Sequence, residues 1–128
     1  MDLDYALLAD HVTVEPEYII FGAGLAGLTT RDLPQPFSFW VVAQFSFPAT
    51  SPVEVACVID VLDPDGGTLA YEGFPATIKP SEANPLLPQL ILARRFENVI
   101  YRLRGPHLVR VTVDGQIGAR LPFEVVRL

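Results

Sequence analysis

The chain has 128 residues, of which half are hydrophobic and 19% are charged, so its composition is that of a globular domain rather than a disordered segment. We expect a single domain over residues 1–128. The formal net charge of −6 disfavours nucleic acid and anionic membranes as partners, because affinity for phosphate comes from clustered Lys and Arg. The longest apolar run, residues 18–28, is about half of the roughly 20 residues that a membrane helix needs.

The cysteine content and the N-terminus both indicate a cytoplasmic location. Cys57 is the single cysteine, so the chain can form no internal disulfide and an oxidising compartment is not favoured. Residues 1–5 are acidic and lack the basic and apolar regions of a secretion signal.

Alternating hydrophobic residues predict β-strands along the whole chain, and the scattered Pro and Gly residues nearly exclude long helices. The N-terminal third predicts strands over Tyr5–Val14, over Tyr18–Gly22 and near Leu28. A further strand over Phe39–Phe47 places one apolar face inward.

The middle of the chain predicts a hairpin. In Glu54–Leu62 every second residue is apolar, which makes Cys57 an inert thiol in the core. The turn sequence Asp63–Gly67 then reverses the chain into a strand over Thr68–Tyr71.

Residues 89–103 fit two secondary structures. Apolar residues at 92, 96, 99 and 103 would line one face of a helix, but the same segment also reads as two strands. We favour strands over Leu90–Phe96 and Ile100–Leu103, and the helix remains open.

The last hairpin has the clearest pattern. Strands over 109–113 and 117–125 flank an Asp114-Gly115 turn, and this register places Arg110 opposite Arg120 on the outer face. Like charges that face each other destabilise a sheet unless something neutralises them. Glu124 or Glu97 can do so within the chain.

An acidic partner surface is the alternative source of neutralising charge. Arg102 and Arg104 would then lie near Arg110 and Arg120 in the same basic region.

About eight short strands in all predict an immunoglobulin-like antiparallel β-sandwich. In such domains a Tyr often lies near the start of a late strand and hydrogen-bonds across the corner. We expect His107 to take this structural place.

A Gly-x-Gly-x-x-Gly run at Gly22, Gly24 and Gly27 suggests a dinucleotide site. Such a site needs a helix after the last glycine, and Pro34 and Pro36 interrupt that segment too early. The ribose-binding acid is also missing. We interpret the glycines as a bend between strands and expect no cofactor.

Other candidates for chemistry are weak. Asp60, Asp63 and Asp65 could gather around a cation, but their spacing matches no EF-hand loop and the segment is explained as a turn. Asp10 and His11 are adjacent, and in one strand they would point to opposite faces. We therefore expect no catalytic residue, no metal site and no enzyme activity.

Taken together, several segments resemble a family of short bacterial proteins known as a domain of unknown function. The resemblance rests on the opening Tyr5–Asp10, the run Ile19–Gly24, the strand and turn Val55–Gly66, and the closing hairpin Gly105–Val125. It implies a β-sandwich and assigns no catalytic residue. His107 and Gly27 depart from the family's usual residues.

These observations favour a module for protein contact or assembly, with an unidentified protein partner or self-association. Exposed apolar patches mark interfaces, and four apolar residues point outward in the predicted strands: Trp40, Val42, Val58 and Leu62. Burial under loops is an equal explanation for some of them. The alternative is a small-ligand or carbohydrate binder with Trp40 or Tyr71 as a stacking platform, and an enzyme is a remote third.

Overall fold

The computed structural model describes residues 1–14, 19–21, 25–48, 53–80 and 86–128, and these residues form strands and no helix. The strands are β1 (Asp2–Ala9), β2 (Val12–Val14), β3 (Ile19–Phe21), β4 (Gly27–Thr30), β5 (Gln35–Ser46), β6 (Glu54–Leu62), β7 (Thr68–Thr77), β8 (Gln89–Tyr101), β9 (Gly105–Val113) and β10 (Gln116–Arg127). Within this part of the chain, no helix is long and apolar enough to cross a membrane.

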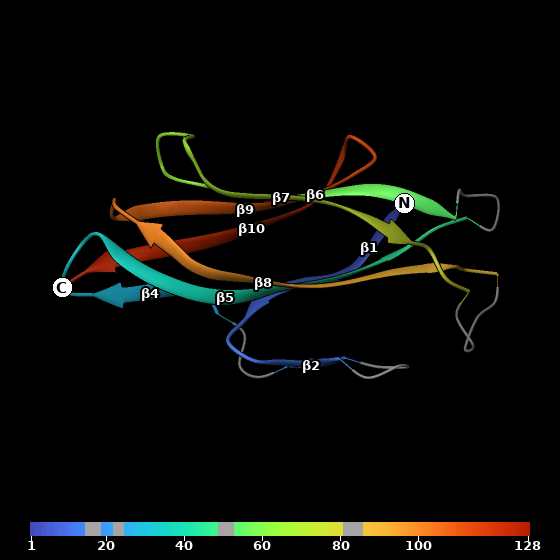
Figure 1. Ribbon diagram of the computed structural model, residues 1–128, viewed down its shortest axis with the longest axis horizontal. Helices are drawn as coiled ribbons and strands as arrows, with labels where there is room; N and C mark the ends of the chain where they lie inside the picture. The colour runs from blue at the N-terminus through green and yellow to red at the C-terminus, as the bar shows by residue number, and fades with distance from the viewer. Residues whose placement is uncertain (15–18, 22–24, 49–52, 81–85) are drawn as a thin grey trace.

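Eight of the strands form two sheets. The smaller sheet has the order β1-β5-β8 and the larger has the order β4-β10-β9-β6-β7, while β2 and β3 form a separate two-stranded hairpin. Figure 1 shows β6, β7, β9 and β10 in one layer and β1, β5 and β8 in the next. The prediction of an all-β fold with about eight strands is confirmed.

One strand pairing departs from the expected antiparallel pattern. β4 runs parallel to β10, and Gly27 lies beside Glu124 at the start of their ladder. A Cβ atom on Gly27 would overlap the backbone carbonyl of Glu124. A glycine inside a strand often marks such a close approach of another backbone. The third glycine of the motif therefore opens a strand, and Gly22 and Gly24 lie outside the described residues.

The core between the two sheets follows the predicted alternation. The inward residues of β6 and β9 are buried, as are most of those of β5 and of β10 beyond its bulge, whereas Phe37 and Leu121 are half-buried. Cys57 is 1% exposed and lies in this core. The strand period of two residues is therefore sufficient to identify the central residues of the core.

The outer side of the smaller sheet is also covered. Val42 is fully buried with Ala9 and Val12 in a second apolar cluster, and Trp40 packs partly buried against it. Figure 1 shows β2 lying beneath this sheet. Of the two explanations for the outward apolar residues, burial therefore applies to Val42, because the chain after β1 folds back over it.

Two other expectations about boundaries are corrected. The predicted strand Tyr5–Val14 is broken between β1 and β2 at Asp10 and His11, so these residues do not alternate within one strand. Residues 89–101 form the single strand β8, in which Asn98 takes a positive φ of 51° near a register shift against β5. The helical alternative for residues 89–103 is wrong, and one irregular strand replaces the two short ones.

Candidate functional site

The outer face of the larger sheet presents a row of side chains that crosses four strands. Tyr71 of β7 pairs with Asp60 of β6, Asp60 pairs with Arg110 of β9, and Arg110 pairs with Arg120 of β10. We call these four residues the central row. The predicted register that sets Arg110 opposite Arg120 is confirmed.

Asp60 and Arg110 form a two-pronged ion pair at the middle of the row. Arg110 Nε donates to Asp60 Oδ1 at 3.1 Å, and Nη2 donates to Oδ2 at 2.5 Å. The Asp60 side chain is 11% exposed and that of Arg110 is 34% exposed. The hydrogen bond and the charge of Asp60 raise the pKa of Arg110 above its ordinary value. Asp60, rather than Glu124 or Glu97, therefore neutralises Arg110, and Glu97 pairs with Arg95 instead.

Arg120 has no such counter-charge. Its side chain is exposed next to Arg110, and the ion pairs among the described residues do not include it. A cation beside another cation on a sheet surface is unfavourable unless an anion or an aromatic ring approaches it. Arg120 is thus the unsatisfied end of the row.

Tyr71 lies at the opposite end of the row, on the edge strand β7. It is 66% exposed. A Cβ atom on Gly73 would lie 3.7 Å from the Tyr71 hydroxyl and 3.9 Å from its ring, so the tyrosine extends along the sheet over the glycine. The row therefore ends in an aromatic ring held against the surface.

Apolar residues flank the central row on both sides. Val58 and Ile117 lie on one side of the row, and Leu62, Leu108 and Pro122 lie on the other. Within the part of the chain that the structure describes, Val58, Leu62 and Leu108 are half-buried and Ile117 is 37% exposed. We call this surface, with the central row, the open face. Figure 1 shows the β6–β7 and β9–β10 turns rising beyond it at its two ends.

The other predicted surface residues do not join the open face. Trp40 lies on the far side of the molecule, on the outer side of the smaller sheet. Arg102 and Arg104 are exposed in the loop between β8 and β9, at one end of the sandwich. Of the five residues predicted to form an interaction surface, only Arg110 and Arg120 lie together on the open face. Asp60 and Tyr71 lie beside them in the central row.

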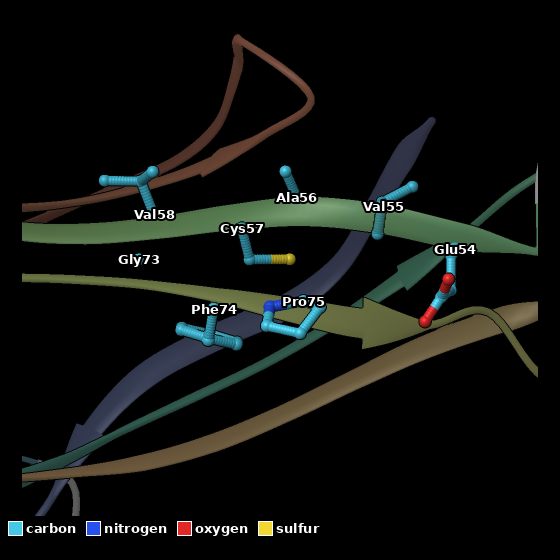
Figure 2. Close-up of a pocket in the computed structure, with 8 residues that line it drawn as sticks. All are labelled: Glu54, Val55, Ala56, Cys57, Val58, Gly73, Phe74 and Pro75. Atoms are coloured by element: carbon cyan, nitrogen blue, oxygen red, sulfur yellow. The ribbon is translucent and has the colours of Figure 1, made fainter.

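A groove of about 540 Å³ lies along β6 and β7 (Figure 2). Its described lining residues are Glu54, Val55, Ala56, Cys57, Val58, Gly73, Phe74 and Pro75. Burial, with a smaller effect from Asp114, raises the pKa of the Cys57 thiol to about 11. A protonated thiol is a poor nucleophile, so this groove holds no activated group.

The three aspartates proposed as cation ligands do not converge. Asp60 is held by Arg110, whereas Asp63 Oδ1 accepts hydrogen bonds from the backbone N–H groups of Asp65 (2.9 Å) and Gly67 (2.8 Å). In the described ranges no group of three or more His, Cys, Asp or Glu residues could hold a metal ion. Asp63 serves the turn, as its sequence suggested.

His107 lies in the core, away from the open face. It is 2% exposed, and its Nδ1 lies 3.0 Å from the Gly105 carbonyl oxygen. Its ring meets that of Tyr101 edge-on with centroids 5.1 Å apart. Burial raises the pKa of Tyr101 far above its ordinary value. The Tyr101 hydroxyl and His107 Nε2 have no hydrogen-bond partner among the described residues.

These features define an all-β protein of two sheets whose larger sheet presents an uncovered face, apolar with a charged centre. The chain belongs to a family of unknown function (DUF6941), whose profile matches residues 4–126. This match confirms that the resemblance to a family of unknown function was correct.

Among solved structures, the chain is similar to the alkylpurine DNA glycosylase AlkC of Pseudomonas fluorescens, solved bound to DNA containing an abasic site analog. The identity is 17% and the TM-score is 0.43, over 94% of this chain and 30% of the glycosylase chain. The chain thus spans less than a third of that protein. No curated protein matches the sequence.

Proposed function

We propose that this protein is an immunoglobulin-like interaction module that binds another protein through its open face and carries out no chemistry. The single observation that carries the proposal is Arg120, a cation that has no counter-charge among the described residues and lies beside the Asp60–Arg110 pair on a sheet surface flanked by apolar residues. Interfaces are enriched in Arg and Tyr and in apolar side chains at their centres. A partner that covers this face would bury the apolar residues and neutralise Arg120.

The strand order supports the immunoglobulin-like part of the proposal. Immunoglobulin domains place strands C, F and G side by side and add C′ next to C in the variable type. Here β6, β9 and β10 lie side by side, and β7 lies next to β6. The opposite sheet, with the order β1-β5-β8, corresponds to strands A, B and E.

The kind of partner follows from charge. The chain has a net charge of −6, and a sheet face with one spare cation gives little affinity for a phosphate backbone. A protein partner is therefore favoured over nucleic acid. The single buried thiol supports a cytoplasmic location for the encounter.

A second candidate function rests on Tyr71, whose exposed ring lies along the surface over Gly73. Such a ring can stack on a sugar. Ligand sites are usually concave with several convergent polar groups, whereas the described lining of the groove along β6 and β7 is mostly apolar and does not include Tyr71. A glycan array would decide this: binding that is lost in Tyr71→Ala would favour the sugar.

The test of the proposed function uses a photo-crosslinking amino acid at Thr112, which lies half-buried within the open face beside Val58. The matched control places the same amino acid at Arg95, on the outer side of the smaller sheet. In the native host, Thr112 should give a discrete crosslinked protein band that Arg120→Glu weakens, and Arg95 should not. Equal bands from both positions, or none from Thr112, would refute the proposal.

A further inference from the structure

The central row is complementary to itself when its direction is reversed. Along the row the order is aromatic ring, anion, cation, cation: Tyr71, Asp60, Arg110 and Arg120. A two-fold axis that lies in the plane of contact and runs parallel to the strands, midway between Asp60 and Arg110, sets a second row against the first in the opposite order. Arg120 then meets the partner's Tyr71, and Asp60 meets the partner's Arg110.

Each of these encounters is favourable. An arginine over a tyrosine ring gains a cation–π contact, and this supplies Arg120 with a partner group that the described residues of its own chain do not provide. The carboxylate of Asp60 can be shared between its own Arg110 and that of the partner. No position of the reversed row places two like charges directly face to face.

The flanking residues match under the same operation. The two-fold axis exchanges the strands but keeps each side of the row where it is, so Val58 comes to lie against the partner's Thr112, and Leu62 against the partner's Leu108. Closed pairs of identical chains commonly use one self-complementary patch in this way. The apolar residues on each side of the row would therefore be buried together with the charges.

From this pattern we infer that the open face binds a second copy of this chain, with Arg120 of each copy on Tyr71 of the other. The inference rests on the proposed function and names its partner. Four strands at about 4.8 Å spacing, over three rows about 6.7 Å apart, give a contact of roughly 20 by 20 Å. This area is smaller than the roughly 800 Å² per partner of a standard interface, so the dimer should be weak and form at micromolar or higher concentration.

The test is a charge exchange measured by sedimentation equilibrium of the full chain from about 10 μM to 1 mM. Tyr71→Lys and Arg120→Glu should each weaken the dimer at least tenfold, because each removes the cation–π contact. The double variant Tyr71→Lys/Arg120→Glu should restore it, since the introduced lysine of one copy would then face the introduced glutamate of the other. Within one chain these two positions are three strands apart, about 14 Å, so a rescue must come from contact between copies.

The control is Arg95→Glu, an exposed position outside the open face, which should leave the dimer unchanged. Both tested side chains are exposed, and thermal melting at low concentration checks that every variant folds.

Two outcomes would overturn the inference: a monomer throughout the concentration range, or a dimer that neither single variant weakens. If the chain is a monomer and Thr112 still crosslinks to a different protein, the proposed function stands and this inference fails. If Thr112 gives no crosslink and the chain is a monomer, both fail.

Discussion

Alanine substitutions at two glycines test the close pairing of β4 with β10, which follows the glycine-rich segment that resembled a dinucleotide motif. Gly27 and Gly73 both lie inside strands, but a Cβ atom on Gly27 would overlap the carbonyl of Glu124, whereas one on Gly73 would meet atoms no closer than 3.7 Å. Relieving the overlap at residue 27 requires β4 to move about 1 Å away from β10, because carbon contacts are favourable near 3.5 to 4.0 Å. Gly27→Ala should therefore destabilise the protein, and Gly73→Ala should not.

The size of the effect follows from what β4 would lose. Two backbone hydrogen bonds bracket its ladder, from Glu124 N–H to the Ala26 carbonyl (3.1 Å) and from Leu128 N–H to the Thr30 carbonyl (2.9 Å). At about 1 kcal/mol each, with about 1 kcal/mol more for partial exposure of Leu28, Gly27→Ala should cost about 3 kcal/mol. The melting temperature would fall by about 10 °C.

The assay is urea unfolding at low protein concentration, followed by tryptophan fluorescence from the single Trp40. Gly73→Ala should be neutral or stabilise by up to about 1 kcal/mol, because it lowers the entropy of the unfolded chain. If Gly27→Ala and Gly73→Ala differ by less than about 0.5 kcal/mol, the close approach of β4 and β10 does not explain the glycine. A dinucleotide should protect neither variant from unfolding.

Further predictions concern buried groups. The Cys57 thiol, whose pKa is raised from 9.0 to about 11, should react with a thiol reagent at pH 8 only after unfolding. Its contribution to the free energy of unfolding should be level below pH 9 and fall as the pH rises toward 11, a fall that Cys57→Ala removes. Tyr101→Phe deletes a buried hydroxyl without a described partner. The free energy of unfolding should stay the same or rise by up to about 1 kcal/mol. A fall of more than about 1 kcal/mol in urea unfolding would show that the hydroxyl has a hydrogen-bond partner. His107→Ala should lower the melting temperature, and an unchanged value would contradict a structural role. Val42→Asp should lower the free energy of unfolding by more than about 3 kcal/mol. Ile117→Asp on the open face should lower it by less than about 1 kcal/mol.

The sequence predicted the pairing of the last hairpin around Arg110 and Arg120 because two local rules fix it. Alternation with a period of two residues assigns each side chain to a face, and the Asp114-Gly115 turn, with φ values of 47° and 79°, sets the register. The opposition of Arg110 and Arg120 follows from these rules and is observed. The same alternation placed Ile117 inward and was wrong there, because a bulge between Ile117 and Ala119 turns Ile117 to the open face.

Asp60 could not be assigned to Arg110 in the same way. The two residues are 50 positions apart in the sequence, and their contact depends on β6 lying beside β9, which no local pattern encodes. For the same reason Trp40 and Val58 looked alike as outward apolar residues. In the structure, Trp40 packs partly buried against the apolar cluster of Ala9, Val12 and Val42, whereas Val58 lies on the open face.

The ion pair between Asp60 and Arg110 can serve either the stability of the sheet or the binding of a partner to the open face. A partly exposed ion pair adds little to the stability of a sheet, and apolar or β-branched residues at the same positions often serve as well. If the pair exists to align two copies, Asp60→Thr/Arg110→Thr should keep the melting temperature within about 3 °C while it weakens self-association. A large fall in melting temperature with unchanged association would mean that the pair serves the sheet itself. The first outcome would mean that the charges at the centre of the open face serve a partner surface rather than the folding of the sheet.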